Sequence, residues 1–164
     1  MSQSAFDEAR QTAATTAKQI AQKLGLRSDE VSILLCSSDG SSLRFLYPEA
    51  LFKTGIRLPN DRNSLAGQAI YYQKPQLHNN MTQIKRMAFF ERVKTGEESP
   101  TPIQKMLTLP ILSGNNVTAI VQCSRKAKTL EEAGPDFTKD DIAALAEDLF
   151  EIATLLPLLR PSDF

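Results

Sequence analysis

The two cysteines and the single histidine are the side chains of this 164-residue sequence best suited to redox chemistry or metal binding. Cys36 and Cys123 lie in separate apolar stretches, without a CxxC pair or a histidine at metal-ligand spacing. The pattern favours buried, reduced thiols over a zinc site or a disulfide framework. Because His78 has no second histidine and no nearby cysteine, haem or metal ligation would need partners that the sequence does not display.

An aromatic pair among cations is a candidate for ligand contact. Phe89 and Phe90 have four basic residues around them: Lys85, Arg86, Arg92 and Lys94. The rings could cover a ligand while the cations meet its anionic group; alternatively, the segment is a solvated helix with one phenylalanine in the core. Similar residues stack on single-stranded nucleic acid, but the 19 basic and 19 acidic residues of the chain cancel. This balance argues against nucleic acid and against an anionic membrane as partners.

Small polar side chains inside apolar stretches form a third group. Thr108 is flanked by leucines, and Ser32 and Cys36 lie in the stretch VSILLCS. They could line the floor of a ligand pocket, or they could form local hydrogen bonds within a packed sheet. His78, with an ordinary pKa of about 6.5, would suit a ligand hydrogen bond, and a loop histidine bonded to backbone is the alternative.

Helices are predicted near both ends of the chain to support these groups. Between residues 4 and 24, apolar side chains recur every three or four positions, and Gly25 is typical of a helix end. The last helix begins at Thr138, with Asp141 at the capping-box position, and its apolar stripe continues to Leu159.

A second apolar stripe lies beside the first on the last helix: Ala146, Phe150 and Ala153. One stripe is enough to dock a helix on a sheet. The wider apolar face predicts a homodimer through the terminal helices. Deeper burial of this helix within its own monomer is the alternative.

Two β-hairpins are predicted between the helices. Residues 31–37 and 42–48 flank a Ser-Asp-Gly-Ser turn, and residues 105–112 and 117–124 flank Ser-Gly-Asn-Asn. Residues 48–104 have little strand signal and form an irregular crossover. This order predicts an α+β domain with a central antiparallel sheet, the terminal helices on one face and the crossover on the other. A sheet roofed in this way can leave a cavity under the roof.

The sequence resembles the GAF domain family of small-molecule sensors over most of its length. The resemblance rests on Leu65-Ala66-Gly67 with Ala69 and Lys74-Pro75, Leu107 to Ile111 with Pro110, Ala119 to Gln122, and Phe137-Thr138 with Asp141. It implies a GAF/PAS-like fold in a single domain, residues 1–164, in which Gly67 lets a short helix lie close against the sheet. The ligand-binding residues expected from the resemblance are Phe45, His78, Asn79, Phe89, Phe90 and Thr108.

Branches of the family narrow the choice of ligand. The pattern of cyclic-nucleotide binders is matched at three of five positions, and Arg125 and Ile142 depart from it. Lys126 and Asp141, which match, are expected to form an ion pair between the last strand and the last helix. Bilin binders attach their chromophore to a cysteine in or near the crossover, and residues 48–104 contain none.

The enzymatic branch is a thiol-dependent free methionine sulfoxide reductase. In the strand order of the family, Cys36 would pair near Thr118 and Cys123 near Val31. The two thiols would then be more than about 15 Å apart, too far for a disulfide within the chain.

We therefore expect a non-catalytic sensory or regulatory domain that binds a small molecule or a protein partner and signals through its terminal helices. A cytoplasmic location is expected because the sequence has no secretory signal and no apolar run near the roughly 20 residues that span a bilayer. The alternatives are the thiol-dependent reductase and an interaction module whose pocket is filled by its own side chains. The sequence identifies no cofactor, and the output protein could be a separate partner.

Overall fold

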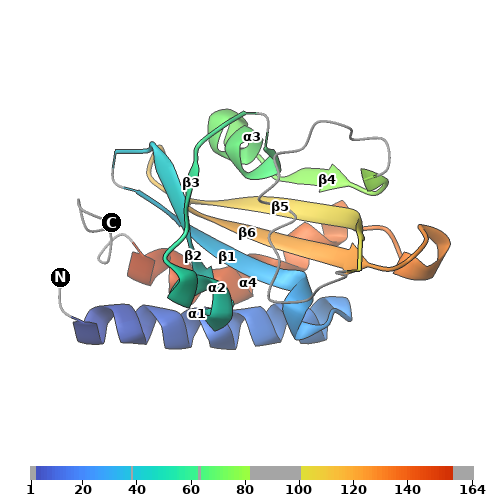
Figure 1. The fold of residues 1–164 in the computed structure, drawn as a ribbon, viewed down its shortest axis with the longest axis horizontal. Helices are drawn as coiled ribbons and strands as arrows, with labels where there is room; N and C mark the ends of the chain where they lie inside the picture. Colours follow the sequence, from blue (N-terminus) through green and yellow to red (C-terminus); the bar gives the residue numbers. More distant parts are fainter. Residues whose placement is uncertain (1–2, 38, 63, 82–100, 157–164) are drawn as a thin grey trace.

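The computed structural model describes residues 3–37, 39–62, 64–81 and 101–156, which form one six-stranded antiparallel sheet with helices on both faces (Figure 1). The strand order is β3-β2-β1-β6-β5-β4. The predicted α+β class with a central antiparallel sheet is confirmed. The elements are α1 (Gln3–Leu24), η1 (Ser28–Glu30), β1 (Val31–Cys36), β2 (Ser42–Tyr47), α2 (Glu49–Thr54), β3 (Arg57–Pro59), α3 (Leu65–Tyr72), β4 (Gln76–His78), β5 (Ile103–Ser113), β6 (Asn116–Lys126), η4 (Glu131–Ala133) and α4 (Lys139–Leu155).

The first hairpin turns where the sequence predicts it. The Asp39 carboxylate accepts hydrogen bonds from the Ser37 hydroxyl at 2.6 Å, the Ser41 amide at 2.9 Å and the Ser41 hydroxyl at 2.7 Å. These donors, the Ser37 hydroxyl first, lower the pKa of Asp39 to about 2. Gly40 has a φ of +76°, a conformation that glycine adopts without steric cost.

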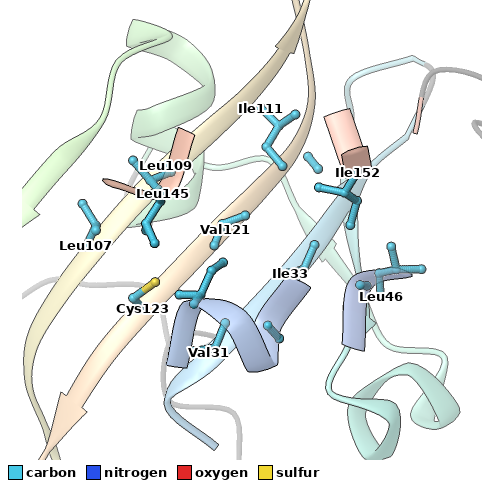
Figure 2. Packing of buried hydrophobic residues seen from close by; sticks show 14 of the residues in the cluster. Val31, Ile33, Leu46, Leu107, Leu109, Ile111, Val121, Cys123, Leu145 and Ile152 are labelled. Carbon is cyan, nitrogen blue, oxygen red and sulfur yellow. The ribbon is translucent and has the colours of Figure 1, made fainter. Parts of the chain in front are cut away.

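The terminal helices α1 and α4 cover one face of the sheet, as expected. Their apolar side chains pack on alternate residues of β1, β5 and β6, and Figure 2 shows side chains of this cluster gathered between the strands and the helices. The two helices also contact each other, because Lys23 forms an ion pair with Asp148 at 2.7 Å and donates to the Ala144 carbonyl oxygen at 2.9 Å. The sheet residues that face this helix cluster are Val31, Ile33, Leu35, Leu46, Leu107, Leu109, Ile111, Ala119, Val121 and Cys123.

The crossover helix α3 lies on the opposite face (Figure 1). Its residues Ala66 and Ala69 are fully buried and pack in a second apolar cluster with Leu34 of β1 and Ile120 of β6. Phe45 of β2 belongs to the same cluster. The sheet therefore separates two apolar clusters, one under α1 and α4 and one under α3.

The start of α4 matches the capping prediction. The Thr138 hydroxyl accepts from the Asp141 amide at 3.2 Å, and the Asp141 carboxylate accepts from the Thr138 amide at 2.9 Å. The expected ion pair between Asp141 and Lys126 is wrong. Asp141 is engaged in this capping box, and the Lys126 ammonium turns instead toward Asp29, donating to its carbonyl oxygen at 2.9 Å.

The loop before α3 is the reason that residue 67 is glycine. The expectation that Gly67 lets the helix lie close against the sheet is therefore corrected. A Cβ at this position would overlap with the carbonyl group of Asp61 and would come within 3.0 Å of the Ser64 hydroxyl oxygen. Ser64 caps α3 by accepting from the Gly67 amide at 2.9 Å, and its hydroxyl donates to the Asp61 carbonyl oxygen at 2.8 Å. The cap folds the loop so tightly over the first turn that only glycine leaves it room.

The second stripe of α4 is at the surface of the single chain. Phe150 is 72% exposed, Ala146 is also exposed, and Ala153 is half-buried beside the helix cluster. The alternative of deeper burial within the monomer is therefore wrong for Phe150 and Ala146. Within the described ranges, no helix combines the length and apolar character needed to cross a membrane.

Candidate functional site

A row of polar side chains crosses four adjacent strands of the sheet. Gln76 on β4 pairs with Thr108 on β5, Thr108 pairs with Gln122 on β6, and Gln122 pairs with Ser32 on β1. Because directly paired residues of antiparallel strands lie on the same face, the four side chains share one face. His78 follows two residues after Gln76 and lies on that face too. We call Ser32, Gln76, His78, Thr108 and Gln122 the polar row.

The polar row lies on the face of the sheet that carries α3. Leu34 and Ile120, two residues along their strands from Ser32 and Gln122, pack in the apolar cluster under that helix. On the other side of the row, Met106 of β5 packs with Leu65 and Met81. Apolar side chains therefore border the row on both sides.

The polar row contains buried atoms without hydrogen-bond partners. Thr108 is completely buried and Gln122 is 4% exposed, yet the Thr108 hydroxyl and the Gln122 side-chain nitrogen have no partner among the described residues. The Gln76 side-chain oxygen and His78 Nδ1 are also buried and find no partner in the part of the chain that the structure describes. Leaving one such group unsatisfied costs about 1–3 kcal/mol. Four such atoms close together in the register leave hydrogen-bonding capacity on this face that the described residues do not fill.

His78 contributes a neutral imidazole to the row. Burial lowers its pKa below the ordinary value because the charged form loses hydration. At neutral pH the ring can therefore donate one hydrogen bond and accept another.

The structure brings together only some of the residues that the sequence singles out. His78 and Thr108 lie close together in the register, since β4 pairs Gln76 with Thr108 and His78 with Met106. Phe45 lies on the same face, but three strands away from Thr108 and within the α3 cluster. Phe89 and Phe90 lie outside the described residues.

Asn79 has a different environment from the polar row. Its side-chain nitrogen donates to the carbonyl oxygen of Phe137 at 3.0 Å, and its side-chain oxygen accepts from the amide of Phe137 at 2.8 Å. These two bonds join the end of β4 to the residue before the cap of α4. Asn79 is thus engaged with backbone instead of facing the row.

Sequence reasoning missed Gln76 and Gln122. A signal for Gln122 was available, because it is a polar residue inside the apolar stretch VTAIVQCS. Gln76 follows the Lys74-Pro75 break and becomes recognisable only when β4 is aligned with β5. The strand register, which is a long-range property, makes these residues neighbours.

The two cysteines lie on opposite faces of the sheet. Cys123 pairs with Val31, as predicted, and packs under the terminal helices, whereas Cys36 packs in the α3 cluster. Both are buried. Burial raises the pKa of Cys123 to about 12, which strongly disfavours the thiolate that thiol chemistry needs. No group of three or more metal-ligating side chains occurs among the residues placed by the structure.

Solved structures resemble this chain over nearly its whole length. Residues 122 to 287 of a methyl-accepting chemotaxis protein match with a TM-score of 0.69 and 10% identity, covering 92% of this chain and 89% of that one. The GAF domain of an Acinetobacter phosphoenolpyruvate-protein phosphotransferase matches with a TM-score of 0.65 and 14% identity, covering 96% and 95%. The type II free methionine-R-sulfoxide reductase of Thermoplasma acidophilum matches with a TM-score of 0.65 and 11% identity, covering 95% and 97%.

A scan of family models and a search of curated proteins find no match. The assignment of the fold therefore depends on the structural likeness to these solved structures, together with the antiparallel sheet and the helices on its two faces. This chain has a GAF-like fold.

Proposed function

We propose that this protein is a non-catalytic sensory or regulatory domain that binds a small molecule on the polar row. The observation that carries the proposal is the fully buried Thr108 hydroxyl, which has no partner within residues 3–37, 39–62, 64–81 and 101–156 and lies in register with the similarly unpartnered groups of Gln76 and Gln122. A ligand that hydrogen-bonds to these groups would offset their desolvation cost. The similarity to a GAF domain and to part of a chemotaxis protein is consistent with this role.

The test uses the purified full chain and its Thr108→Val variant. Native mass spectrometry should detect a retained small molecule, or a panel of nucleosides, amino acids, sugars and tetrapyrroles should contain a compound that raises the melting temperature. Valine is nearly isosteric with threonine and removes only the hydroxyl. The variant should lose at least about tenfold in affinity while its ligand-free form is as stable as the original or up to about 1–3 kcal/mol more stable. Absence of any ligand effect would favour the interaction module with a filled pocket.

Binding is proposed to reach the terminal helices through Asn79. This residue directly follows His78 of the polar row and holds the backbone of Phe137, one residue before the cap of α4. The Phe137 ring lies under the Arg125 guanidinium, 4.7 Å from the ring centroid, and Arg125 donates to the carbonyl oxygen of Leu24, the last residue of α1, at 3.0 Å. A shift of β4 on binding would thus bias the ends of both helices, provided that the ligand prefers one of two arrangements.

Replacing Asn79 by alanine should loosen this connection locally. Hydrogen–deuterium exchange of the amides from Phe137 to Ile142 should accelerate, because both side-chain bonds to Phe137 are lost. Amides of β1 serve as the internal control and should keep their protection. Asn79→Asp, which retains the acceptor for the Phe137 amide, should have a smaller effect. Equal acceleration in β1 would indicate general destabilisation and would contradict a specific link.

The output is proposed to be a homodimer formed through the terminal helices. Phe150 of α4 is 72% exposed, and the neighbouring Ala146 is exposed as well, which leaves an apolar stripe for a second copy of the chain. Sedimentation at tens of micromolar should show a dimer, and Phe150→Asp should shift it to the 18.2 kDa monomer. A monomer for the unchanged chain would overturn this part of the proposal.

The reductase alternative draws support from the similarity to the Thermoplasma enzyme. It would require the two thiols to cooperate, but Cys36 and Cys123 are buried in clusters on opposite faces of the sheet. We therefore expect the chain to have no methionine sulfoxide reductase activity. Turnover that disappears when both cysteines are replaced by serine would establish the alternative.

A further inference from the structure

The members of the polar row are all uncharged at neutral pH. The row presents hydroxyls on Ser32 and Thr108, carboxamides on Gln76 and Gln122, and the imidazole of His78. Hydroxyl and carboxamide groups can each donate and accept hydrogen bonds, and a neutral imidazole can do both. The row therefore offers donors and acceptors side by side without a formal charge.

Two charged residues beyond the β1 end of the row already have partners. Directly before the start of β1, the buried Glu30 carboxylate accepts from the Arg27 amide at 2.8 Å and from the Lys126 amide at 2.6 Å. The Lys126 ammonium donates a hydrogen bond to the Asp29 carbonyl oxygen and forms an ion pair with the Asp29 carboxylate. Because Glu30 also forms an ion pair with Arg27 at 3.7 Å, neither side chain leaves an uncompensated charge for a ligand.

The two buried cations of β5 and β6 are engaged toward the terminal helices instead of the row. The Lys105 ammonium donates to the Gly134 carbonyl oxygen at 2.8 Å and to Asp136 at 2.7 Å. The Arg125 guanidinium donates a hydrogen bond to the carbonyl oxygen of Leu24 and lies over the Phe137 ring. An anionic ligand on the row would thus be buried without a counter-charge from these described side chains, which is costly.

We propose that the polar row selects an uncharged compound with a carboxamide or lactam group and discriminates against the corresponding carboxylate. This inference rests on the proposed function, that the row binds a small molecule. An amide edge places a donor beside an acceptor, as the row does, whereas a carboxylate has acceptors only and carries a charge. The apolar borders formed by Leu34 with Ile120 and by Leu65 with Met106 favour an apolar body on the same compound.

Matched pairs of small probes test the inference: nicotinamide against nicotinate, and benzamide against benzoate. Each pair differs only in the polar group. Calorimetric titration at pH 7.5 should give at least about tenfold tighter binding of each amide, equivalent to about 1.4 kcal/mol. Thr108→Val should abolish the preference, and Thr108→Ser, which keeps the hydroxyl, should retain it.

The outcomes separate this inference from the proposed function. Carboxylates that bind as tightly as the amides would overturn the amide selectivity. So would amides that show no binding at a probe concentration of roughly 20 mM, near the weakest affinity expected for fragments of this size. An anionic molecule retained in native mass spectrometry and released by Thr108→Val would also overturn it, while leaving the ligand-binding role intact. If the unchanged chain neither retains a molecule nor responds to any compound, both proposals fail.

Discussion

Replacing Phe137 by alanine is expected to lower the free energy of unfolding by about 3–5 kcal/mol, the usual cost of truncating a buried phenylalanine. Phe137 is 1% exposed and packs in the cluster under the terminal helices. Its ring also lies under the Arg125 guanidinium, which would lose its aromatic partner. Urea unfolding should show a clearly lower midpoint with an unchanged slope.

Phe137→Leu is the matched control for this prediction. Leucine keeps most of the apolar volume but removes the aromatic face under Arg125, and it should cost no more than about 1.5 kcal/mol. The difference between the two variants measures the lost burial of apolar atoms together with the cavity that alanine leaves. A loss below about 1 kcal/mol for Phe137→Ala would contradict the tight packing of this ring.

Replacing Gly67 by alanine is expected to destabilise the protein by about 1–3 kcal/mol, although alanine is the better helix former. Alanine would normally gain about 1 kcal/mol in the interior of a helix. Here the added methyl group overlaps with the Asp61 carbonyl, a backbone group that cannot rotate away as a flexible side chain could. For a domain of this size the melting temperature should fall by roughly 2–4 °C per kcal/mol.

Ser64→Ala provides a comparison for the same loop. It removes the helix cap that accepts from the Gly67 amide, without adding any atom near Asp61, and should cost about 1–2 kcal/mol. If Gly67→Ala raised the melting temperature, helix propensity would dominate and the loop would have moved away freely.

Local patterns in the sequence were enough to predict the scaffold. The apolar periodicity over residues 4–24, the capping box of Thr138 and Asp141, and the turn residues of both hairpins each specify their element within a few neighbouring positions. Short elements of the crossover, α2 and β4, were not predicted. Three paired residues, as in β4, have too little periodicity to be recognised without the neighbouring strand.

The candidate site was harder to predict from the sequence, because the pairing register of the strands decides which side chains become neighbours. Gln122 and Gln76 are far apart along the chain and share a row only through their pairing with Thr108. Side-chain partners were equally hard to predict. Lys126 had an acidic residue available at Asp29 as well as at Asp141, and the commitment of Asp141 to its capping box decided between them.

The two faces of the sheet have a consequence for how such a protein diverges. The groups that would recognise a ligand lie on one face, and the apolar cluster that holds the terminal helices lies on the other. A substitution at Thr108 or Gln122 would therefore change the proposed recognition face and leave the contacts of the terminal helices in place. Under the proposed function, a few changes on one face would alter which compound is recognised and leave the packing of the terminal helices as it is.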